Sequence, residues 1–517
     1  IFHLSVIEKV MDDFAAQVTL FSLILLATVG YQIYRSIAAN RNLPPSPLSI
    51  PVVGHLHLLK VPLHLSFFNL SRKYGHVFSF RFGSHPAVIV SSSSAAEECF
   101  TTNDVVLANR KNFSTMSKYV TYNFTTVASS SYGDHWRNLR RIGAIEIFSS
   151  KRLNLYTKVR NDEVRSLLIN LGAQSRSGFS KVELKSMFSD MTLNNIMRMV
   201  AGKRYYGRGP AADVDEAKEF KEVMASIIAN AGVGHIEDFL PFLRWVKGGK
   251  FEREIRHTAA RCDRLLQGLI DEHRRKGKES SETTSATLID RMLSLQQSEP
   301  EYYSDEIIKG FILIMLLAGT DTTAVTLEWA MTFLVNNPGV LEKAKNEVDA
   351  LIGEDRLIEE SDLSNLHYLQ AVIMETLRLQ PPAPLLVPHY SSDDCVIGGF
   401  DVSRNTMVIV NAWAIQRDPS VWEDPEIFNP DRFQERTNHE SNRLMPFGLG
   451  RRACPGAGMA HRVMGLALGS MIQCFEWRRV GEELVDMTEA TGSVISKKKP
   501  LVADCKARDI FIKQFPW

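Results

Sequence analysis

The sequence predicts a mainly helical protein with a small β region, preceded by one transmembrane helix. Three observations support this fold class: an uncharged run over residues 14–34, short apolar segments between residues 77 and 90, and long helical patterns beyond residue 156. The 517 residues are 44% hydrophobic, which is enough for a large core. The net charge of +1 gives no reason to expect a nucleic-acid partner.

The amino-terminal run, residues 14–34, carries no charged side chain and is mostly apolar. Such a run is long enough to cross a bilayer as one helix, which needs about 20 residues. Acidic residues precede it and no small-residue cleavage site follows it, so a retained anchor is favoured over a cleaved signal peptide or a buried core helix. Arg35 and Arg41 follow the run and only Lys9 precedes it, which places the body of the protein in the cytoplasm.

The segments beside the anchor have separate characters. Residues 1–13 form an N-terminal segment that starts with Ile1, and because Met11 would be a natural start, the native status of residues 1–10 is left open. Residues 35–53 form a basic and proline-rich hinge. Proline fixes φ and removes a backbone donor, so a stiff extended spacer is expected there. Residues 54–517 are expected to form the main domain.

The first part of this domain has strand and helix patterns. Val77–Phe82 and Ala87–Val90 are predicted strands, separated by a glycine and a proline. The region from Tyr156 to Gln297 is predicted to be mainly helical, with a surface loop over residues 280–286. An apolar patch, Phe239–Trp245, either borders a substrate entrance or dips into lipid, and ordinary core packing is an equal alternative.

A long helix is predicted for Asp305–Asn336, where a proline follows. Its middle, Phe311–Leu317, is strongly apolar, whereas Ala318-Gly-Thr-Asp-Thr-Thr323 interrupts that pattern. A carboxylate and hydroxyls inside a buried helix are costly unless they are satisfied or used. Because hydroxyls compete for helix carbonyls, we expect a local bulge at which Asp321 and Thr322 line a pocket. A helix kink with self-satisfied threonines is the alternative.

The most informative stretch is Pro446–Gly456, which reads Pro-Phe-Gly-Leu-Gly-Arg-Arg-Ala-Cys-Pro-Gly. Its glycines allow positive φ and close approach to a flat group. Arg451 and Arg452 are expected to lower the pKa of the Cys454 thiol, and Phe447 to shield the sulfur from water. A lone thiolate is a poor zinc site but suits the axial position of haem iron. A buried structural cysteine is the alternative.

The spacing of Phe447, Gly450, Arg452, Cys454 and Gly456 resembles the haem-binding signature of the cytochromes P450. The resemblance covers nearly all of residues 44–517 and includes four ordered motifs. It implies a P450 fold, a haem-thiolate monooxygenase domain over residues 54–517, and haem b with Cys454 as the axial ligand of its iron. The cofactor-binding residues that it implies are Cys454, Trp136, Arg140, His389, Arg452, Phe447 and Gly448.

Two further motifs support the resemblance. Trp136 and Arg140 lie four residues apart on one predicted helical face, so both can donate to a carboxylate, and in the family the matching pair binds a haem propionate. The family places His389 near a propionate as well. A solvated basic face and a structural histidine are the ordinary alternatives. The family also implies a catalytic pair in which Thr322 organises water and Asp321 relays protons.

The remaining implied positions are structural or contact the substrate. Glu375 and Arg378 lie three residues apart on one helical face and resemble the family pair that joins Arg432 to brace the core near the thiolate. An ordinary surface pair is the alternative. Asp431, before this arginine, stands where many members have Glu. The resemblance assigns the substrate pocket to Ala318, Leu386, Val387 and Val494.

Local details such as Asn411-Ala-Trp-Ala-Ile415 are similar to the plant branch that contains isoflavone hydroxylases and sesamin synthase-like enzymes. This implies a plant microsomal oxidoreductase, single-pass in the endoplasmic reticulum membrane, with its catalytic domain facing the cytoplasm. It would hydroxylate or oxidatively ring-close a plant specialised metabolite, using O₂ and electrons from NADPH through a reductase. An aromatic or phenolic substrate such as a flavonoid, isoflavonoid, benzophenone or xanthone is expected; a terpenoid or lignan stays open.

The expected partners are a small-molecule substrate, NADPH–cytochrome P450 reductase and membrane lipid. Six basic residues would steer the acidic reductase if they cluster: Arg137, Arg141, Lys343, Lys345, Arg451 and Arg462. Two other classes are alternatives. A haem-thiolate isomerase or dehydratase needs no external electrons and usually lacks the acid–alcohol pair, and a membrane-tethered binding protein would hold inactive haem. The sequence does not identify the substrate, the carbon attacked or the number of oxidations.

Overall fold

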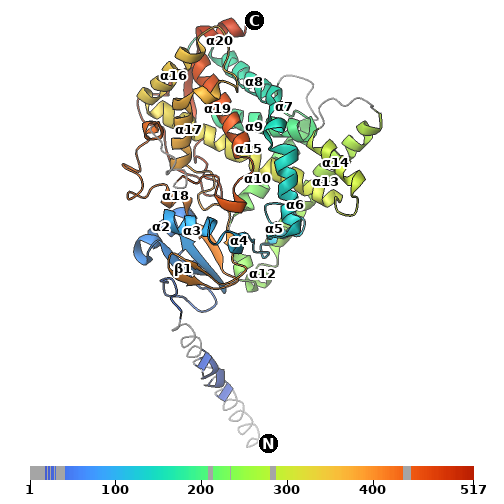
Figure 1. Cartoon of the computed structure of the whole chain (residues 1–517), viewed down its shortest axis with the longest axis vertical. Coiled ribbons are helices and arrows are strands. Elements are labelled where there is room, and N and C mark those ends of the chain that lie inside the picture. Colours follow the sequence, from blue (N-terminus) through green and yellow to red (C-terminus); the bar gives the residue numbers. More distant parts are fainter. Residues whose placement is uncertain are drawn as a thin grey trace, which may run out of the picture.

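The computed structural model describes residues 41–207, 214–232, 234–279, 287–434 and 444–516, together with residues 18–19, 21–23, 25–27 and 29–30. The residues of this last group are helical and exposed, and they lie apart from the body of the molecule (Figure 1). The rest of the predicted anchor over 14–34, the segment 1–13, hinge residues 35–40 and the predicted loop 280–286 lie outside the described residues.

Most of the described body is helical, as the sequence predicts, and helix α15 (Asp305–Asn336) runs through its centre (Figure 1). The helices before it are η1 (Leu56–Leu58), α2 (Leu63–Tyr74), α3 (Ser93–Phe100), α4 (Asp104–Leu107), α5 (Thr115–Val120), α6 (Asp134–Ile142), η2 (Gly143–Ile147), α7 (Ser150–Leu155), α8 (Thr157–Ser175), α9 (Leu184–Ala201), α10 (Val214–Asn230), α11 (Ile236–Phe239), α12 (Phe242–Val246), α13 (Lys250–Glu279) and α14 (Leu288–Ser298). Those after it are α16 (Pro338–Ile352), η3 (Leu363–Asn365), α17 (His367–Leu379), α18 (Ala412–Ile415), η4 (Pro430–Phe433), η6 (Gly450–Arg452), α19 (Ala457–Cys474) and α20 (Asp509–Gln514).

The β region consists of three small sheets. The largest has the order β1-β2-β7-β4, formed by β1 (Val77–Phe82), β2 (His85–Val90), β7 (Met407–Val410) and β4 (His389–Tyr390). The second has the order β3-β9-β8, formed by β3 (Ser180–Glu183), β9 (Val502–Ala507) and β8 (Phe475–Arg479). A hairpin joins β5 (Cys395–Ile397) to β6 (Phe400–Val402).

The bounds of the strands show what the sequence pattern captured. β1 has the predicted bounds, whereas β2 begins before the predicted Ala87. Pro86 fits inside β2 because the parallel pairing of β2 with β7 starts only at Ala87. Strand β7 therefore does not need a hydrogen bond from the N–H group that proline lacks. β3 is a strand within the region predicted to be mainly helical, and it forms by pairing with β9, which lies far away in the sequence.

Helix α15 supplies much of the core, with fully buried side chains such as Ile312, Leu313 and Trp329. In the described part of the chain it is the one helix long and apolar enough to cross a membrane, and 61% of its most apolar stretch is buried inside the body. It packs against α9, and a Cβ added to Gly319 would lie 2.7 Å from the Cδ1 atom of Ile196. Glycine at this position therefore permits the close approach of the two helices.

The local bulge predicted within α15 is wrong, because the helix is continuous from Asp305 to Asn336. The hydroxyl of Thr322 donates to the carbonyl of Ala318 at 2.6 Å, and that of Thr326 donates to the carbonyl of Thr322 at 2.8 Å. The hydroxyls of Thr322 and Thr326 are thus satisfied one turn back without displacing the backbone hydrogen bonds of the helix, whereas the Thr320 hydroxyl has no hydrogen-bond partner among the described residues.

Candidate active site

A loop before α19 presents Cys454. Gly448 and Gly450 have φ of +67° and +66°, in the left-handed region that favours glycine. A Cβ at Gly450 would also lie 2.5 Å from a carboxylate oxygen of Asp104. The backbone N–H of Cys454 donates to the carbonyl of Phe447 at 2.8 Å, which closes the loop. Gly456 has an ordinary φ of −88°, so its backbone conformation does not require glycine.

The surrounding protein raises the pKa of the Cys454 thiol by desolvation, while two backbone N–H groups at the start of α19 and the guanidinium of Arg140 act in the opposite direction. The expectation that Arg451 and Arg452 lower this pKa is wrong. Arg451 forms an ion pair with Asp104 at 3.2 Å, and Arg452 turns toward backbone carbonyls. The cation that favours the thiolate comes from α6 instead of the cysteine loop.

Cys454 lines a cavity that has α15 in another of its walls. The α15 side chains that line it include Phe311, Met315, Ala318 and Thr322. Most of the lining is apolar, which keeps competing hydrogen bonds away from a bound molecule. The cavity brings together eleven of the residues predicted from the sequence: Trp136, Arg140, Ala318, Thr322, Leu386, Val387, His389, Phe447, Gly448, Arg452 and Cys454.

Three arginines line this cavity, and we call Arg110, Arg140 and Arg452 the cavity arginines. They donate to backbone carbonyls, for example from Arg110 to Pro388 at 3.0 Å and from Arg140 to Ala453 at 2.6 Å. Among the described residues, none of the three has a carboxylate partner. Burial lowers the pKa of Arg110 to about 9 and that of Arg452 to about 10.

This uncompensated positive charge fits haem b, whose porphyrin carries two propionates. Buried cations without counter-ions are costly, so a cavity that keeps three of them suits a ligand that brings carboxylates. A thiol in the same cavity suits a soft metal centre. The residues present therefore fit the cofactor predicted from the sequence, and Arg110 is an addition to the predicted set.

Trp136 and His389 lie at the cavity, and each already uses one ring nitrogen in a hydrogen bond to a backbone carbonyl. The indole N–H of Trp136 donates to the carbonyl of Val127 at 3.1 Å. The Nδ1 atom of His389 lies 2.8 Å from the carbonyl of Leu107, so this nitrogen carries the hydrogen. Burial and the nearby cavity arginines lower the pKa of His389 to about 3, which keeps the imidazole neutral. A carboxylate beside its other nitrogen would raise that pKa.

The predicted catalytic pair is split by the structure. Thr322 lines the cavity, whereas Asp321 lies outside the lining and near Lys185 of α9. Burial raises the pKa of the Asp321 carboxyl, and Lys185 partly opposes this shift. Within the part of the chain that the structure describes, this carboxyl has neither a hydrogen-bond nor an ion-pair partner. The two residues were expected to line one pocket. Instead, they lie on different sides of α15.

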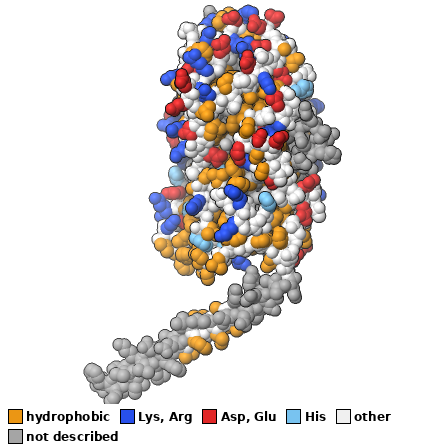
Figure 2. All heavy atoms as spheres, turned by 90° about the vertical axis from the view of Figure 1, so that its left-hand side faces the viewer, with side chains coloured by type: hydrophobic (Ala, Val, Ile, Leu, Met, Phe, Trp, Pro, Cys, Tyr) orange, Lys and Arg blue, Asp and Glu red, His pale blue; other side chains and the backbone are white. Residues whose placement is uncertain are grey.

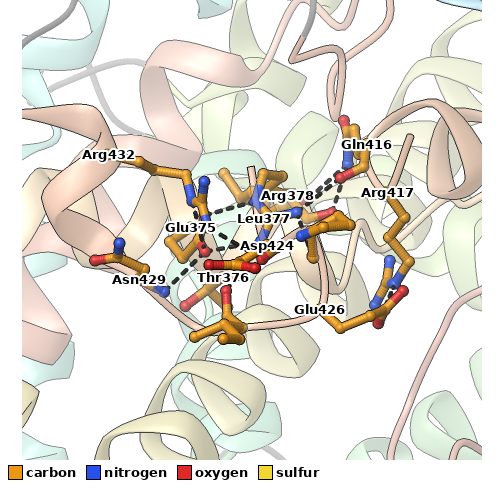
Figure 3. A network of polar contacts seen from close by, with 12 residues as sticks. Glu375, Thr376, Leu377, Arg378, Gln416, Arg417, Asp424, Glu426, Asn429 and Arg432 are labelled. Atoms are coloured by element: carbon orange, nitrogen blue, oxygen red, sulfur yellow. Dashed lines mark hydrogen bonds and ion pairs between the residues drawn. The ribbon is translucent and has the colours of Figure 1, made fainter. Parts of the chain in front are cut away.

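The buried residues Glu375 and Arg378 form a network with the partly buried Arg432 (Figure 3), and none of the three lines the cavity. Arg378 donates to the two carboxylate oxygens of Glu375 at 2.6 and 2.8 Å, and Arg432 donates to one of them at 3.2 Å. Arg378 also donates to the carbonyls of Gln416 and Pro425 at 2.8 and 2.7 Å. The network ties α17 to the segment before the cysteine loop, which is the geometry that the family resemblance predicted.

Val494 is placed differently from its prediction, because it is absent from the cavity lining and packs against the main core. The turn that carries it does approach the site, since the N–H of Ile495 donates to the carbonyl of Pro382, a lining residue, at 3.0 Å. The backbone of this turn thus supports the wall, while the Val494 side chain points into the core cluster.

Sequence reasoning missed many of the residues that line the cavity, and the two that matter most are Arg110 and Phe148. Arg110 lies between Asn109 and Lys111, outside every element predicted from the sequence. No helical or strand periodicity therefore indicates which way its side chain points. Phe148 follows the π-turn η2, and a search for the 3.6-residue repeat of an α-helix does not place the side chain after such a turn.

Comparisons with known proteins agree with this site. The model of the family "Cytochrome P450" matches residues 44–503. Cytochrome P450 81E8 of Medicago truncatula is 52% identical over 492 residues, which cover 95% of this chain and 96% of that protein. Isoflavone 3'-hydroxylase of the same plant is 50% identical over 496 residues, covering 95% and 98%.

A third relative, (+)-piperitol/(+)-sesamin synthase CYP81Q2 of Sesamum radiatum, is 46% identical over 498 residues, covering 95% of this chain and 97% of that protein. Among solved structures, a zebra fish cytochrome P450 with progesterone superimposes with a TM-score of 0.74 at 26% identity, covering 87% of this chain and 100% of that one. A cysteine, a threonine and three arginines without carboxylate partners among the described residues surround one cavity. Together with these comparisons, this site shows that the chain belongs to the cytochrome P450 family and is a monooxygenase.

Proposed function

We propose that this monooxygenase holds haem b in the cavity and oxidises a neutral aromatic plant metabolite. Cys454 would ligate the iron, and the cavity arginines with Trp136 and His389 would bind the propionates. When bound, the haem supplies the activation of O₂ that the amino acids cannot perform, using two electrons from a donor. The observation that carries the proposal is that Cys454 and Thr322 line the same, mostly apolar cavity.

The chain's own contribution is to position groups and move protons. Apolar residues of α15, including Phe311, Ile314 and Met315, exclude bulk water and orient the substrate. Thr322 presents a hydroxyl to the cavity, where it would hold water at the reacting end. Asp321, whose pKa is raised by burial, would take up protons on the other side of α15 and pass them toward Thr322.

The cavity lining supports an uncharged substrate. Its ionisable side chains are the cavity arginines, His389 and Cys454, and all of these have a role toward haem. The side chains left for a substrate are apolar or carry hydroxyls, which suits an aromatic ring with neutral phenol groups. Relatives named isoflavone 3'-hydroxylase and sesamin synthase favour a phenolic such as a flavonoid, isoflavonoid, benzophenone or xanthone, and a lignan or terpenoid is the second choice.

We infer that NADPH–cytochrome P450 reductase supplies the electrons and docks on the cysteine side. The six basic residues proposed for steering do not form one unpaired patch. Arg137, Lys343 and Arg451 are paired with Asp134, Asp431 and Asp104. Because these pairs involve exposed side chains, they are weak, and an acidic partner could replace them at little cost.

We also infer that the protein is anchored in the endoplasmic reticulum membrane, with residues 14–34 as anchor and 35–53 as hinge, and that the body faces the cytoplasm. A group of exposed apolar side chains supports a second contact with lipid: Leu48, Val52 and Val61 near the hinge, and Trp245 and Val246 on α12, the last two 89% and 77% exposed. Hydrophobic side chains gather at the lower end of the body in Figure 2, which is the end where Figure 1 places α12. Phe239 and Leu240 of the predicted patch are instead buried.

The experiment that tests the proposed function has two steps. A carbon-monoxide difference spectrum of the reduced protein reports thiolate ligation, and Cys454→Ala should abolish it together with activity. Microsomes carrying the protein are then offered a panel of plant phenolics with and without NADPH and reductase. Product that depends on both supports the proposal. Product formed without electrons would identify an isomerase or dehydratase, and a haem protein without any turnover would identify a binding protein.

A further inference from the structure

The connection between α6 and α7 is a π-turn, η2, placed beside the cysteine loop. The N–H of Phe148 donates to the carbonyl of Gly143, five residues back, at 3.0 Å. Such a turn contains one residue more than an α-helical turn, so it rotates the side chains that follow it to new directions. It changes the direction of Phe148, the first residue after the turn.

The π-turn is fixed in place by Glu146. This carboxylate accepts hydrogen bonds from Arg152 at 2.8 Å and from Arg291 at 3.0 and 3.2 Å. Arg291 belongs to α14, so the turn is tied to a helix far away in the sequence. The Glu146 side chain is only 15% exposed, so its carboxylate is shielded from water, although the Arg291 side chain is 41% exposed.

The phenyl ring of Phe148 lies beside the sulfur of Cys454. A Cβ added to Gly456 would lie 3.5 Å from the Cε1 atom of Phe148 and 3.8 Å from the Sγ atom of Cys454, so ring and sulfur flank the same glycine. A Cβ added to Gly143 would lie 3.9 Å from the ring on another side. Two glycines therefore frame the ring at the cavity wall, where Phe148 is a lining residue.

We infer that Phe148 is a positioning residue that keeps water away from the Cys454 thiolate, as a second aromatic wall in addition to Phe447. The inference rests on the proposed haem-thiolate function. Water that reached the sulfur would donate hydrogen bonds to it and withdraw electron density from the metal. Hydrogen bonding and solvent exposure of sulfur ligands set the reduction potential of such centres. The π-turn and the Glu146 ion pairs hold the ring in this position.

The test compares Phe148→Ala with Phe148→Leu in the full-length, haem-loaded protein. Two quantities are measured: the reduction potential of the haem iron, and the rate at which the reduced carbon-monoxide complex loses its thiolate-type spectrum. The alanine variant should have a higher potential and lose the thiolate-type spectrum several-fold faster. The leucine variant, which still excludes water, should stay near wild type. A purely structural role would lower the melting temperature and leave the potential unchanged.

Two more variants make the test specific. Glu146→Gln keeps the ring but releases the turn, so it should shift both quantities in the direction of Phe148→Ala; Ile145→Ala, at an exposed position of the same turn, should shift neither. If the alanine variant does not retain haem, Phe148→Val replaces it. An unchanged potential and an unchanged spectral lifetime in the Phe148 variants would overturn the inference. A wild-type protein without a thiolate-type spectrum would instead refute the proposed function.

Discussion

Partly or fully buried arginines occur in two regions of this protein, and the two regions differ in whether a carboxylate pairs with them. In the network at the end of α17, Arg378 and Arg432 share the carboxylate of Glu375 at 2.6 and 3.2 Å. The cavity arginines contact backbone carbonyls and, among the described residues, no carboxylate. An unpaired buried charge costs several kcal/mol. The difference indicates that the first region completes the fold by itself, whereas the cavity is built for negative charge that comes from outside the chain.

The largest expected effect comes from removing the carboxylate of the network at the end of α17. Glu375→Gln leaves Arg378 and Arg432 buried without a carboxylate, so the free energy of unfolding should fall by about 3–5 kcal/mol. Denaturant unfolding measures it. The control is Glu354→Gln, which removes an exposed pair with Lys513 at 3.3 Å and should cost about 1 kcal/mol or less. Equal losses in both variants would show that the network does not stabilise the fold.

The same substitution in the two regions sharpens the comparison. Arg110→Met removes a charge that has no carboxylate partner among the described residues, so its main effect should be on haem retention: transfer of haem to excess apomyoglobin should be roughly 10–100-fold faster, as expected for the loss of one charge-assisted hydrogen bond. Arg378→Met should mainly lower the free energy of unfolding. The comparison would fail if Arg110→Met destabilised the fold as much as Arg378→Met and left haem transfer unchanged.

The sequence predicts the fold well where a pattern is strong and local. The bounds of α15 and β1 agree with their predictions, because long apolar runs and clear end signals determine both. The cysteine loop was recognised because several residue types at fixed spacing are rarer than any one of them. Arg110 was not recognised, because a single arginine outside a motif has no signature until the fold places it in a cavity.

Tertiary contacts determine the remaining differences. Asp321 was expected to share a pocket with Thr322, but adjacent residues of an unbroken helix point about 100° apart, so only one of them faces the cavity. Val494 was assigned from the family alone, and packing of its turn turns the side chain into the core. Phe148 depends on a π-turn that the ion pairs of Glu146 hold, and this long-range contact is invisible in the local sequence.

A smaller effect is expected at Asp321, a partly buried acid without a hydrogen-bond or ion-pair partner among the described residues. Burial raises its pKa, so the folded protein keeps this proton to higher pH than the unfolded chain does. Stability from the protonated form is therefore lost as pH rises from the unfolded pKa through the folded pKa. The side chain in Asp321→Asn stays neutral at every pH. The free energy of unfolding of this variant should therefore increase relative to that of wild type as pH rises through this window, while product formation falls. A difference that is constant between pH 4 and pH 8 would contradict this account.

The smallest effect on stability is expected at Thr322, whose hydroxyl donates to the carbonyl of Ala318 in the same helix. Thr322→Ala should cost about 1 kcal/mol or less in unfolding free energy. The variant should nevertheless release more hydrogen peroxide per product formed, because the proposed proton route loses the hydroxyl that reaches the cavity. Thr332→Ala is the matched control, since that hydroxyl bonds to the carbonyl of Glu328 at 2.7 Å outside the cavity lining. An equal ratio of hydrogen peroxide to product in the two variants would refute the role of Thr322.

The contrast between the two arginine regions is tested most directly by the affinity of the haem-stripped protein for haem b and for its dimethyl ester, in which both propionates are neutral. If the cavity arginines are kept for these carboxylates, haem b should bind far more tightly than the ester, and Arg110→Met should reduce that preference. Equal affinities for the two compounds would contradict the claim that the cavity is built for the charge of its cofactor.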